Sequence, residues 1–215
     1  MVCTEIATLP LISGSDIEDQ NSPAGRVWRE MYNTLQGQTG YQQASYGRGV
    51  ESPNVVLLFV NWDSLKHHQD FMASTDYAPF FNNLKGILDP DNPPSITHYE
   101  FASPGTLSQA LGAPATELAM FYFDNKSDQF ESGLQPVAEA FDKHAEGFIA
   151  VDHAWSIEKV KHQGNELTQC LVLVGWQSVE AHQKFAQTDT LKSIFKDLAQ
   201  QTKGTDMYHV IMKSF

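Results

Sequence analysis

The feature that most constrains this chain is a segment that it contains twice. VNWDSLKHHQDF, residues 60–71, returns as VGWQSVEAHQKF, residues 174–185, with Val, Trp, Ser, His, Gln and Phe at matching places. Agreement of this extent indicates an internal repeat. A chain of 215 residues has room for two modules of roughly 100 residues each, so both copies can bury a core of their own.

The repeat extends beyond this segment. TEIA at 4–7 matches TELA at 116–119, and His98 in ITHYEF matches His209 in MYHVIM. Gly40 and Gly147 stand where the first helix of each copy is expected to end, as C-caps. Each copy therefore predicts the order strand, helix, strand, strand, helix, strand.

Turn residues and apolar runs set the expected elements, and Ser22 before Pro23 is a good helix start. In the first copy we expect strands at 5–11, 41–50, 55–61 and 96–101, with helices from Ser22 and from about Ser64. In the second copy we expect strands at 117–123, 148–160, 170–175 and 207–215, with helices at 136–144 and 178–198.

This order is the ferredoxin-like plan, one antiparallel sheet with two helices on one face. VVLLFV at 55–60 and CLVLVG at 170–175 are apolar at nearly every position, as in strands buried on both sides. We therefore predict an α+β fold of two ferredoxin-like βαββαβ modules, packed sheet to sheet as an intrachain dimeric α+β barrel. The expected bounds are 1–101 for module one, 102–115 for a linker and 116–215 for module two.

Composition excludes several functions. A net charge of −12 without a Lys/Arg cluster argues against nucleic-acid binding. No apolar run approaches the length of a membrane span, and the N-terminal residues do not resemble a secretory signal. Cys3 and Cys170 do not suggest a disulfide framework. We expect a cytoplasmic protein without a membrane partner.

The W-x-S-x-x-x-H-x-x-F signature that follows an apolar strand, at Trp62 to Phe71 and again at Trp176 to Phe185, resembles the antibiotic biosynthesis monooxygenase group. That group belongs to the dimeric α+β barrel superfamily, and the resemblance covers most of the chain twice. It implies two ferredoxin-like sheets packed back to back. The superfamily includes cofactor-independent oxygenases, olivetolic-acid-type cyclases, haem-degrading enzymes and stress proteins, so the resemblance alone does not fix the chemistry.

The repeated residues are interpreted mainly as scaffold. Trp62 and Trp176 end the central strands, although both also remain candidates for binding substrate. His68 and His182 are expected to tie a helix to a neighbouring loop. His98 and His209 could act as a general base or could instead be interface residues.

Residues that differ between the copies are the better candidates for chemistry. Tyr46 and Arg48 share one face of their strand and could bind a phenolate or enolate, or Arg48 could simply reach water. His153 and Trp155 hold the equivalent places in the second copy. In the resembled cyclases a His acts with a Tyr. Here Tyr77 stands at the His position and Phe71 at the Tyr position, so the cyclase mechanism does not carry over as it stands. Tyr77 could still donate a proton, or could be an amphipathic residue at a helix break.

The first copy is the better candidate for the pocket, because aromatic side chains could line it for a planar ligand. The expected substrate-binding residues are Trp28, Tyr32, Trp62, Phe80 and Phe81, and the expected catalytic residues are His98, Tyr46, Arg48 and Tyr77. Candidates in the second copy are His153, Trp155, Trp176 and His209.

No nucleotide-binding or metal-binding motif is present, so we expect neither a cofactor nor a metal. Haem remains an alternative, with His98, His153 or His209 as its axial ligand. The predicted function is a cofactor-independent monooxygenase of secondary metabolism, acting on an aromatic or polyketide-like small molecule. Alternatives are a cyclase or isomerase on the same scaffold, and a non-catalytic ligand-binding or stress-type module. The chain is expected to be a pseudo-dimeric monomer, with further homodimerisation left open.

Overall fold

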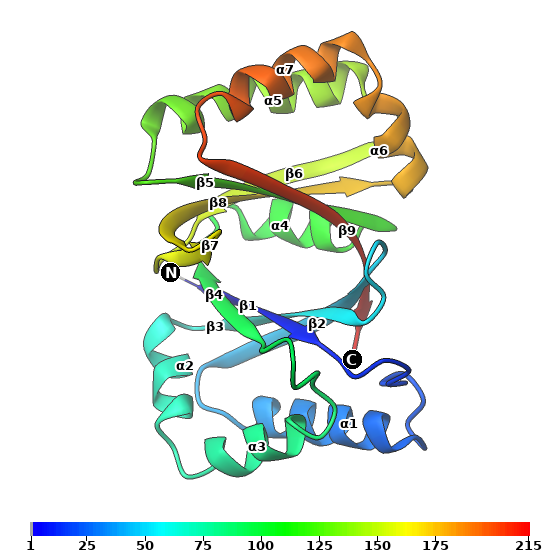
Figure 1. Cartoon of the computed structure of the whole chain (residues 1–215), viewed down its shortest axis with the longest axis vertical. Helices are drawn as coiled ribbons and strands as arrows, with labels where there is room; N and C mark the ends of the chain where they lie inside the picture. The colour runs from blue at the N-terminus through cyan, green and yellow to red at the C-terminus, as the bar shows by residue number, and fades with distance from the viewer. Residues whose placement is uncertain (1) are drawn as a thin grey trace. The chain divides into compact units, whose positions relative to one another are not determined.

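The computed structural model describes residues 2–215, which form two compact units. The first, here called module 1, comprises the chain up to residue 100 together with 213–215. The second, module 2, comprises residues 101–212. Each module contains one antiparallel sheet and a layer of helices (Figure 1).

The elements of module 1 follow the predicted order, with the second helical region divided in two. They are β1 (Cys3–Pro10), α1 (Pro23–Gln36), β2 (Tyr41–Gly49), β3 (Val55–Trp62), α2 (Leu65–Met72), α3 (Tyr77–Leu84) and β4 (Ser95–Tyr99).

Module 2 repeats this order after one additional helix, and it contains one additional short strand. Its elements are α4 (Pro104–Leu111), β5 (Ala115–Phe123), α5 (Asp128–His144), β6 (Phe148–Trp155), β7 (Val160–His162), β8 (Asn165–Trp176), α6 (Val179–Ala186), α7 (Asp189–Ala199) and β9 (Gly204–Ser214), whose last residues join module 1.

The two sheets have the same strand order. Module 1 pairs its strands as β4-β1-β3-β2, and module 2 pairs the equivalent strands as β9-β5-β8-β6. The register is also equivalent, since Glu5 lies opposite His98 and Glu117 lies opposite His209. This order confirms a ferredoxin-like fold in both modules. The predicted packing of one sheet on the other stays a prediction.

Local sequence signals explain where several helices begin. The Ser22 hydroxyl accepts a 2.8 Å hydrogen bond from the Gly25 amide, with Pro23 in the first helical position. The Ser178 hydroxyl caps α6 in the same way. Ser64 occupies the N-cap of α2 as predicted, but its hydroxyl contacts the His67 ring at 3.0 Å instead of a backbone amide.

Gly40 and Gly147 occupy equivalent turns just before β2 and β6. Their φ angles are +81° and +86°, in the region that favours glycine. They are not the helix C-caps that the sequence suggested, because the C-cap of α1 is Gly37 and that of α5 is Ala145. A Cβ on Gly147 would also lie 2.8 Å from Cβ of Ala181 in α6. The turn before β6 therefore requires glycine for conformation and for space.

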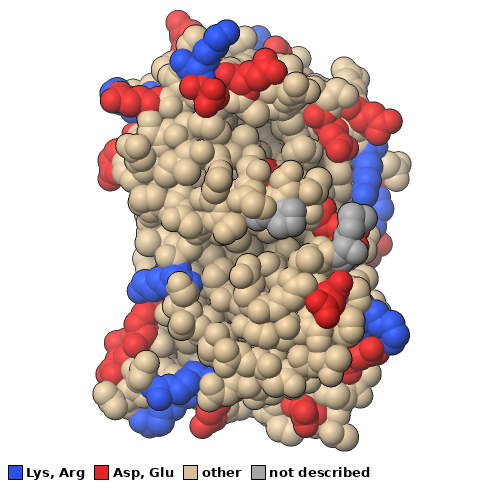
Figure 2. All heavy atoms as spheres, turned by 180° about the vertical axis from the view of Figure 1, so that it is seen from behind, with Lys and Arg blue, Asp and Glu red and all other residues tan. Residues whose placement is uncertain are grey.

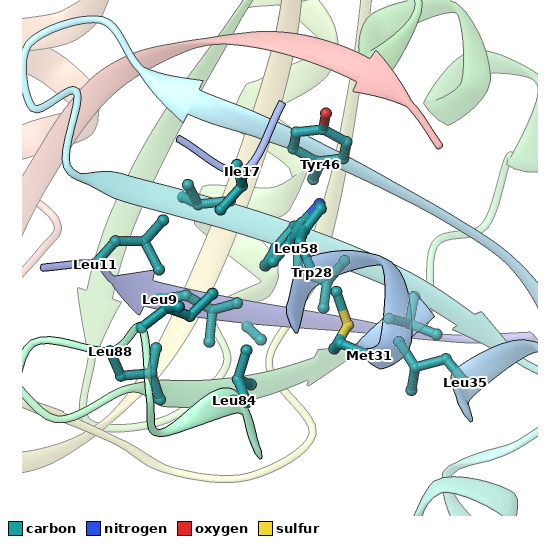
Figure 3. Packing of buried hydrophobic residues seen from close by; sticks show 14 of the residues in the cluster. Leu9, Leu11, Ile17, Trp28, Met31, Leu35, Tyr46, Leu58, Leu84 and Leu88 are labelled. Atoms are coloured by element: carbon teal, nitrogen blue, oxygen red, sulfur yellow. The ribbon is translucent and has the colours of Figure 1, made fainter. Parts of the chain in front are cut away.

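Each module has its own apolar core between the sheet and the helices. In module 1, Trp28, Met31 and Leu35 of α1 pack on residues of the sheet such as Leu9 and Leu58 (Figure 3). In module 2 the equivalent cluster includes Phe130 and Phe141 of α5 and Trp176 at the end of β8. β3 and β8 are buried along nearly their whole length, as their continuous apolar sequences predict.

The segment expected as a linker contains α4, which the sequence analysis did not predict. α4 packs against β6 and β8, and the Thr116 hydroxyl donates a 2.8 Å hydrogen bond to the Ala110 carbonyl. Gly175 permits this close approach, because a Cβ there would lie 2.9 Å from Ala113. Within the described part of the chain, none of the helices has the length and apolar character needed to span a membrane.

Candidate functional site

Each module buries a cluster of one Glu, one Trp and two His, which we call the Glu–His–His cluster. The Glu comes from the first strand of the module, the Trp from the end of the third strand, one His from the following helix and the other His from the last strand. All of these side chains are buried. The members are Glu5, Trp62, His68 and His98 in module 1, and Glu117, Trp176, His182 and His209 in module 2.

The module 2 cluster brings the carboxyl group, the indole and the two imidazoles close together. Trp176 Nε1 donates a 2.8 Å hydrogen bond to Glu117 Oε2. His182 Nε2 lies 3.6 Å from the same oxygen, and His182 Nδ1 lies 2.7 Å from His209 Nε2. His182 therefore stands between the carboxyl group and the second imidazole, where it can pass a proton from one to the other.

The module 1 cluster has almost the same geometry. Trp62 Nε1 donates to Glu5 Oε2 at 2.8 Å, and His68 Nε2 lies 3.4 Å from that oxygen. His68 Nδ1 lies 2.7 Å from His98 Nε2. The first His of each cluster thus ties its helix to the last strand, and not to a loop as the sequence suggested.

Burial changes the protonation of both carboxyl groups. It raises the pKa of Glu5 and of Glu117 to about 7, although the indole donors Trp62 and Trp176 act in the opposite direction, joined at Glu5 by the charge of His98. A carboxyl group with such a pKa exchanges its proton near neutral pH, which is the property of a general acid or base.

The donor atoms of each cluster also lie within 4.8 Å of one another, which is close enough to consider a metal ion. The central His, however, directs one ring nitrogen to the carboxyl group and the other to the second His. His182 Nδ1 and His209 Nε2 already contact each other at 2.7 Å, so a metal ion would have to displace that contact. The arrangement fits proton transfer better than metal binding.

Module 2 contains a cavity of about 320 Å³ between its sheet and the helices α5 and α7. Its walls are largely apolar, and Glu117 of the cluster forms part of them. A cavity of this size and character is typical of a small-molecule site. Its lining includes Glu117, Glu131, Gln135, His153 and Val172.

The polar groups of the cavity differ in exposure. The Glu117 side chain is only 5% exposed, whereas the side chains of His153 and Glu131 are 33% and 50% exposed. His153 Nε2 lies 3.7 Å from Glu131 Oε1, and Trp155 Nε1 donates a 2.9 Å hydrogen bond to Glu131 Oε2. The cavity therefore has a buried carboxyl group on one wall and a pair of more exposed titratable groups on another.

The corresponding positions of module 1 carry larger side chains. Tyr46 lies opposite Leu58 in the sheet of module 1, and His153 lies opposite Val172 in the sheet of module 2. Tyr46 is buried and packs against Trp28 and Phe215, with ring centroids 5.2 and 4.8 Å away. The pocket that we expected in the first copy is thus occupied at these positions by the protein's own side chains.

Arg48 is held by polar groups of the neighbouring loops. Its guanidinium makes a bidentate ion pair with Glu18. It also donates hydrogen bonds to the backbone carbonyls of Ser15 and Pro53. These bonds hold the segment before α1 and the turn after β2 against the strand. The hypothesis that Arg48 binds an anionic substrate with Tyr46 stays a prediction, and the observed contacts are structural.

The other aromatic residues predicted in module 1 fall into two groups. Trp28 and Tyr32 lie against Phe215, whereas Phe80 and Tyr77 pack against Phe71. Tyr77 also stacks on Phe81, with parallel rings 6.0 Å apart. Burial is the larger cause, and the nearby Glu5 the smaller one, of a raised pKa at Tyr77. Tyr77 therefore keeps its proton and can act as a hydrogen-bond donor.

His98 and His209 do not fit the role of an axial haem ligand. His98 and His209 each place Nε2 at 2.7 Å from another imidazole, so the nitrogen that would coordinate iron is already engaged. His153 lies beside Glu131 at the cavity.

Sequence reasoning missed the two carboxyl groups on which the clusters depend. Glu5 and Glu117 stand at the same place in TEIA and TELA, inside strands that are otherwise almost fully buried. An acidic residue repeated within two apolar strands is a signal for a buried, functional carboxyl group, because Glu is rarely buried without a partner.

Charged side chains on the face shown in Figure 2 are scattered, and basic residues lie next to acidic ones. This view shows no extended basic surface of the kind that nucleic acids require.

No protein-family model and no curated protein matches the sequence. Among solved structures, an anthrone oxidase-like protein matches with a TM-score of 0.70 and 16% identity, over 99% of this chain and 93% of that one. Candidate monooxygenases from Lactobacillus acidophilus and Fusobacterium nucleatum each match with a TM-score of 0.56 and 10% identity, over 98% and 99% of this chain and 93% and 94% of theirs.

The chain has the fold of these proteins. The likeness spans both modules, so the chain is a fusion of two ferredoxin-like units and not one unit with an unrelated extension. The resemblance to the antibiotic biosynthesis monooxygenase group is thereby confirmed at the level of the fold.

Proposed function

We propose that the chain is a cofactor-independent monooxygenase that acts on an aromatic or polyketide-like intermediate in the module 2 cavity. The proposal rests on the position of Glu117, whose carboxyl group lines an apolar cavity and has its pKa raised by burial to about 7. Such a group is half ionised near neutral pH and becomes a stronger base than an exposed carboxylate.

The substrate class follows from what this base can activate. One structurally similar protein is described as anthrone oxidase-like. A planar aromatic ketone with an acidic methylene group, as in an anthrone, suits the apolar walls and loses a proton to a base of moderate strength. We therefore propose this class of substrate for the present chain.

The reaction begins when the Glu117 carboxylate takes a proton from the methylene carbon and leaves a delocalised carbanion. The carbanion transfers one electron to O₂, and the resulting radical pair combines to form a carbon–oxygen bond. Cleavage of the peroxide O–O bond, with loss of the second C–H proton, then gives a carbonyl group. One oxygen atom of O₂ enters the product, and the other leaves as water with both hydrogen atoms of the methylene group.

The remaining groups bind and position the substrate. The apolar walls exclude water from the carbanion, which slows its reprotonation. His153 and Gln135 supply hydrogen-bonding groups for the ketone oxygen. His182 lies 3.6 Å from Glu117 and contacts His209 at 2.7 Å, so the two imidazoles can take up the proton that Glu117 accepts.

The test is oxygen consumption with an anthrone as substrate. Glu117→Gln keeps the shape of the side chain but cannot accept the proton, so we expect turnover to fall by about 10²-fold or more. Glu5→Gln is the matched control. Glu5 contacts Trp62 and His68, the equivalents in module 1 of the partners of Glu117, but it does not line the module 2 cavity. Wild-type turnover in Glu117→Gln would contradict the proposal.

The oxygen balance also separates the alternatives. One O₂ consumed for each product molecule supports a monooxygenase. Conversion of a substrate without oxygen uptake would instead support a cyclase or isomerase that uses the same base. Binding of the anthrone with no conversion in the wild type would favour a ligand-binding module.

A further inference from the structure

The ring of Phe215 occupies an aromatic slot in module 1. It stacks on Tyr32 with the rings parallel to within 2° and their centroids 4.0 Å apart. The ring of Trp28 stacks on it with a centroid distance of 5.7 Å and an interplanar angle of 21°. The ring of Tyr46 is tilted by 51°, with its centroid 4.8 Å away. Three aromatic side chains from α1 and β2 therefore surround one flat ring, which is the contact pattern that a planar aromatic ligand would receive.

The residue in the slot is weakly held. Phe215 remains partly exposed. The adjacent ion pair between Lys213 Nζ and Glu18 Oε1 measures 3.3 Å, with the side chains 48% and 28% exposed. Exposed ion pairs contribute little to stability, and Glu18 is already paired with Arg48. Displacement of the Phe215 ring would thus break few strong interactions.

A buried donor in the same slot lacks an acceptor. Trp28 is 3% exposed, and its Nε1 has no hydrogen-bond partner among the residues that the structure describes. The three other Trp side chains each donate to a carboxylate, namely Trp62 to Glu5, Trp155 to Glu131 and Trp176 to Glu117. An unsatisfied buried N–H is unfavourable, so an unpaired one in a native structure requires an explanation. Figure 3 shows Trp28 next to Tyr46 in this core.

We propose that module 1 binds a planar aromatic ligand that carries a carbonyl or phenolate oxygen, in the slot that the Phe215 ring occupies. The ligand ring stacks on Tyr32 in place of Phe215, and its oxygen accepts the hydrogen bond from Trp28 Nε1. The site is separate from the module 2 cavity and does not depend on the function proposed there.

The first measurement is made on the wild-type protein, with one variant used only to assign the resonance. In a ¹⁵N-correlated NMR spectrum, the indole N–H of Trp28, assigned through Trp28→Phe, is expected upfield of the three hydrogen-bonded indole resonances. If it resonates among them, Trp28 has an acceptor and the proposal is wrong.

The second measurement opens the slot. Phe215→Ala is titrated with anthraquinone-2-sulfonate, a planar probe with two carbonyl acceptors, and the titration is followed by NMR and calorimetry. We expect the Trp28 indole proton to move downfield, with affinity at this site at least 10-fold above that of the wild type. Trp28→Phe in the Phe215→Ala background should weaken the new site, because the donor is gone.

Phe215→Leu controls for loss of packing, since it fills part of the slot without a stacking ring. We expect it to bind more tightly than the wild type and more weakly than Phe215→Ala, and it replaces Phe215→Ala if that variant does not fold. A Trp28 resonance that stays unchanged at saturating probe in the folded variant would show that Phe215 is only a core residue. Oxygen consumption by the module 2 cavity should be retained in Phe215→Ala, so failure here is distinguishable from failure of the proposed function.

Discussion

Trp176 Nε1 and Glu117 Oε2 are joined by a hydrogen bond of 2.8 Å, and Trp62 and Glu5 are joined by one of the same length. An N–H that points at a carboxylate stabilises its charged form and so opposes the effect of burial. The indole therefore adjusts how readily the buried carboxyl group gives up its proton. The two copies allow each change in module 2 to be compared with the same change in module 1.

Replacement of Trp176 by Phe should move the pH dependence of turnover. Without the indole donor, the pKa of Glu117 rises above its present value of about 7. Because the base acts in its charged form, the acidic limb of the kcat/KM profile should shift to higher pH. Trp62→Phe removes the equivalent bond in module 1 and should leave the profile in place. An unchanged profile in folded Trp176→Phe would show that Glu117 is not the base.

The buried carboxyl groups should also make the protein less stable as the pH rises. The pKa of Glu5 and of Glu117 is raised from 4.5 to about 7 on folding, so the folded state binds more protons than the unfolded state between these values. The free energy of unfolding that these groups contribute is then fully present below pH 4.5 and is lost as pH rises through 7, by about 3 kcal/mol for each group.

Glu5→Gln and Glu117→Gln should each remove one such step, and the double variant should remove both. Urea denaturation between about pH 5 and about pH 8 measures these slopes. Glu139→Gln, at an exposed position, is the control and should not flatten the slope. A single variant that keeps the full wild-type slope would contradict the assignment for that carboxyl group.

Filling the cavity with a larger side chain should raise the stability of the protein and weaken substrate binding. Val172 lines the cavity, and its counterpart in module 1 is Leu58, which is buried in the core. Val172→Leu adds one methylene group to empty space, which should stabilise the protein by up to about 1 kcal/mol and raise KM. Leu58→Val should instead cost about 1 kcal/mol and leave KM unchanged. Thermal denaturation and steady-state kinetics on both variants provide the check, and equal effects on KM would argue against the cavity as the substrate site.

Glycine at the turn before β6 should be essential for packing as well as for conformation. Gly147 and Gly164 both have positive φ, but of the two only Gly147 stands where a Cβ would meet a neighbour, Ala181, at 2.8 Å. Gly147→Ala should therefore destabilise the protein by more than Gly164→Ala, for which about 1 kcal/mol of backbone strain is expected. Denaturation midpoints of the two variants test the difference, and equal losses would show that α6 moves to make room.

The repeated sequence was sufficient to predict the fold of each module because its signals are local. Ser22 with Pro23 fixes the start of α1, and the apolar runs fix β3 and β8. Prediction was less successful where tertiary packing determines the bounds of an element. Pro136 suggested a helix start, yet it lies inside α5, which begins earlier in the chain under the cap of Ser127.

The candidate site could be predicted only in part. His98 and His209 were recognised as possible bases, but their pairing with His68 and His182 depends on the contact between a helix and the last strand. The position of the cavity depends on the size of side chains that meet only in the folded module, such as Tyr46 and Leu58 against His153 and Val172. Phe215 gave no sequence signal at all, since its partners lie far away along the chain.

The close contact of α4 with β8 determines where the polypeptide can be divided. A gene split after Glu100 leaves α4 with the second fragment, so the helix still covers Gly175. A split after Leu111 removes that cover and exposes the apolar surface of β6 and β8 to solvent. Co-expressed halves made from the first design should remain soluble, and those from the second should aggregate.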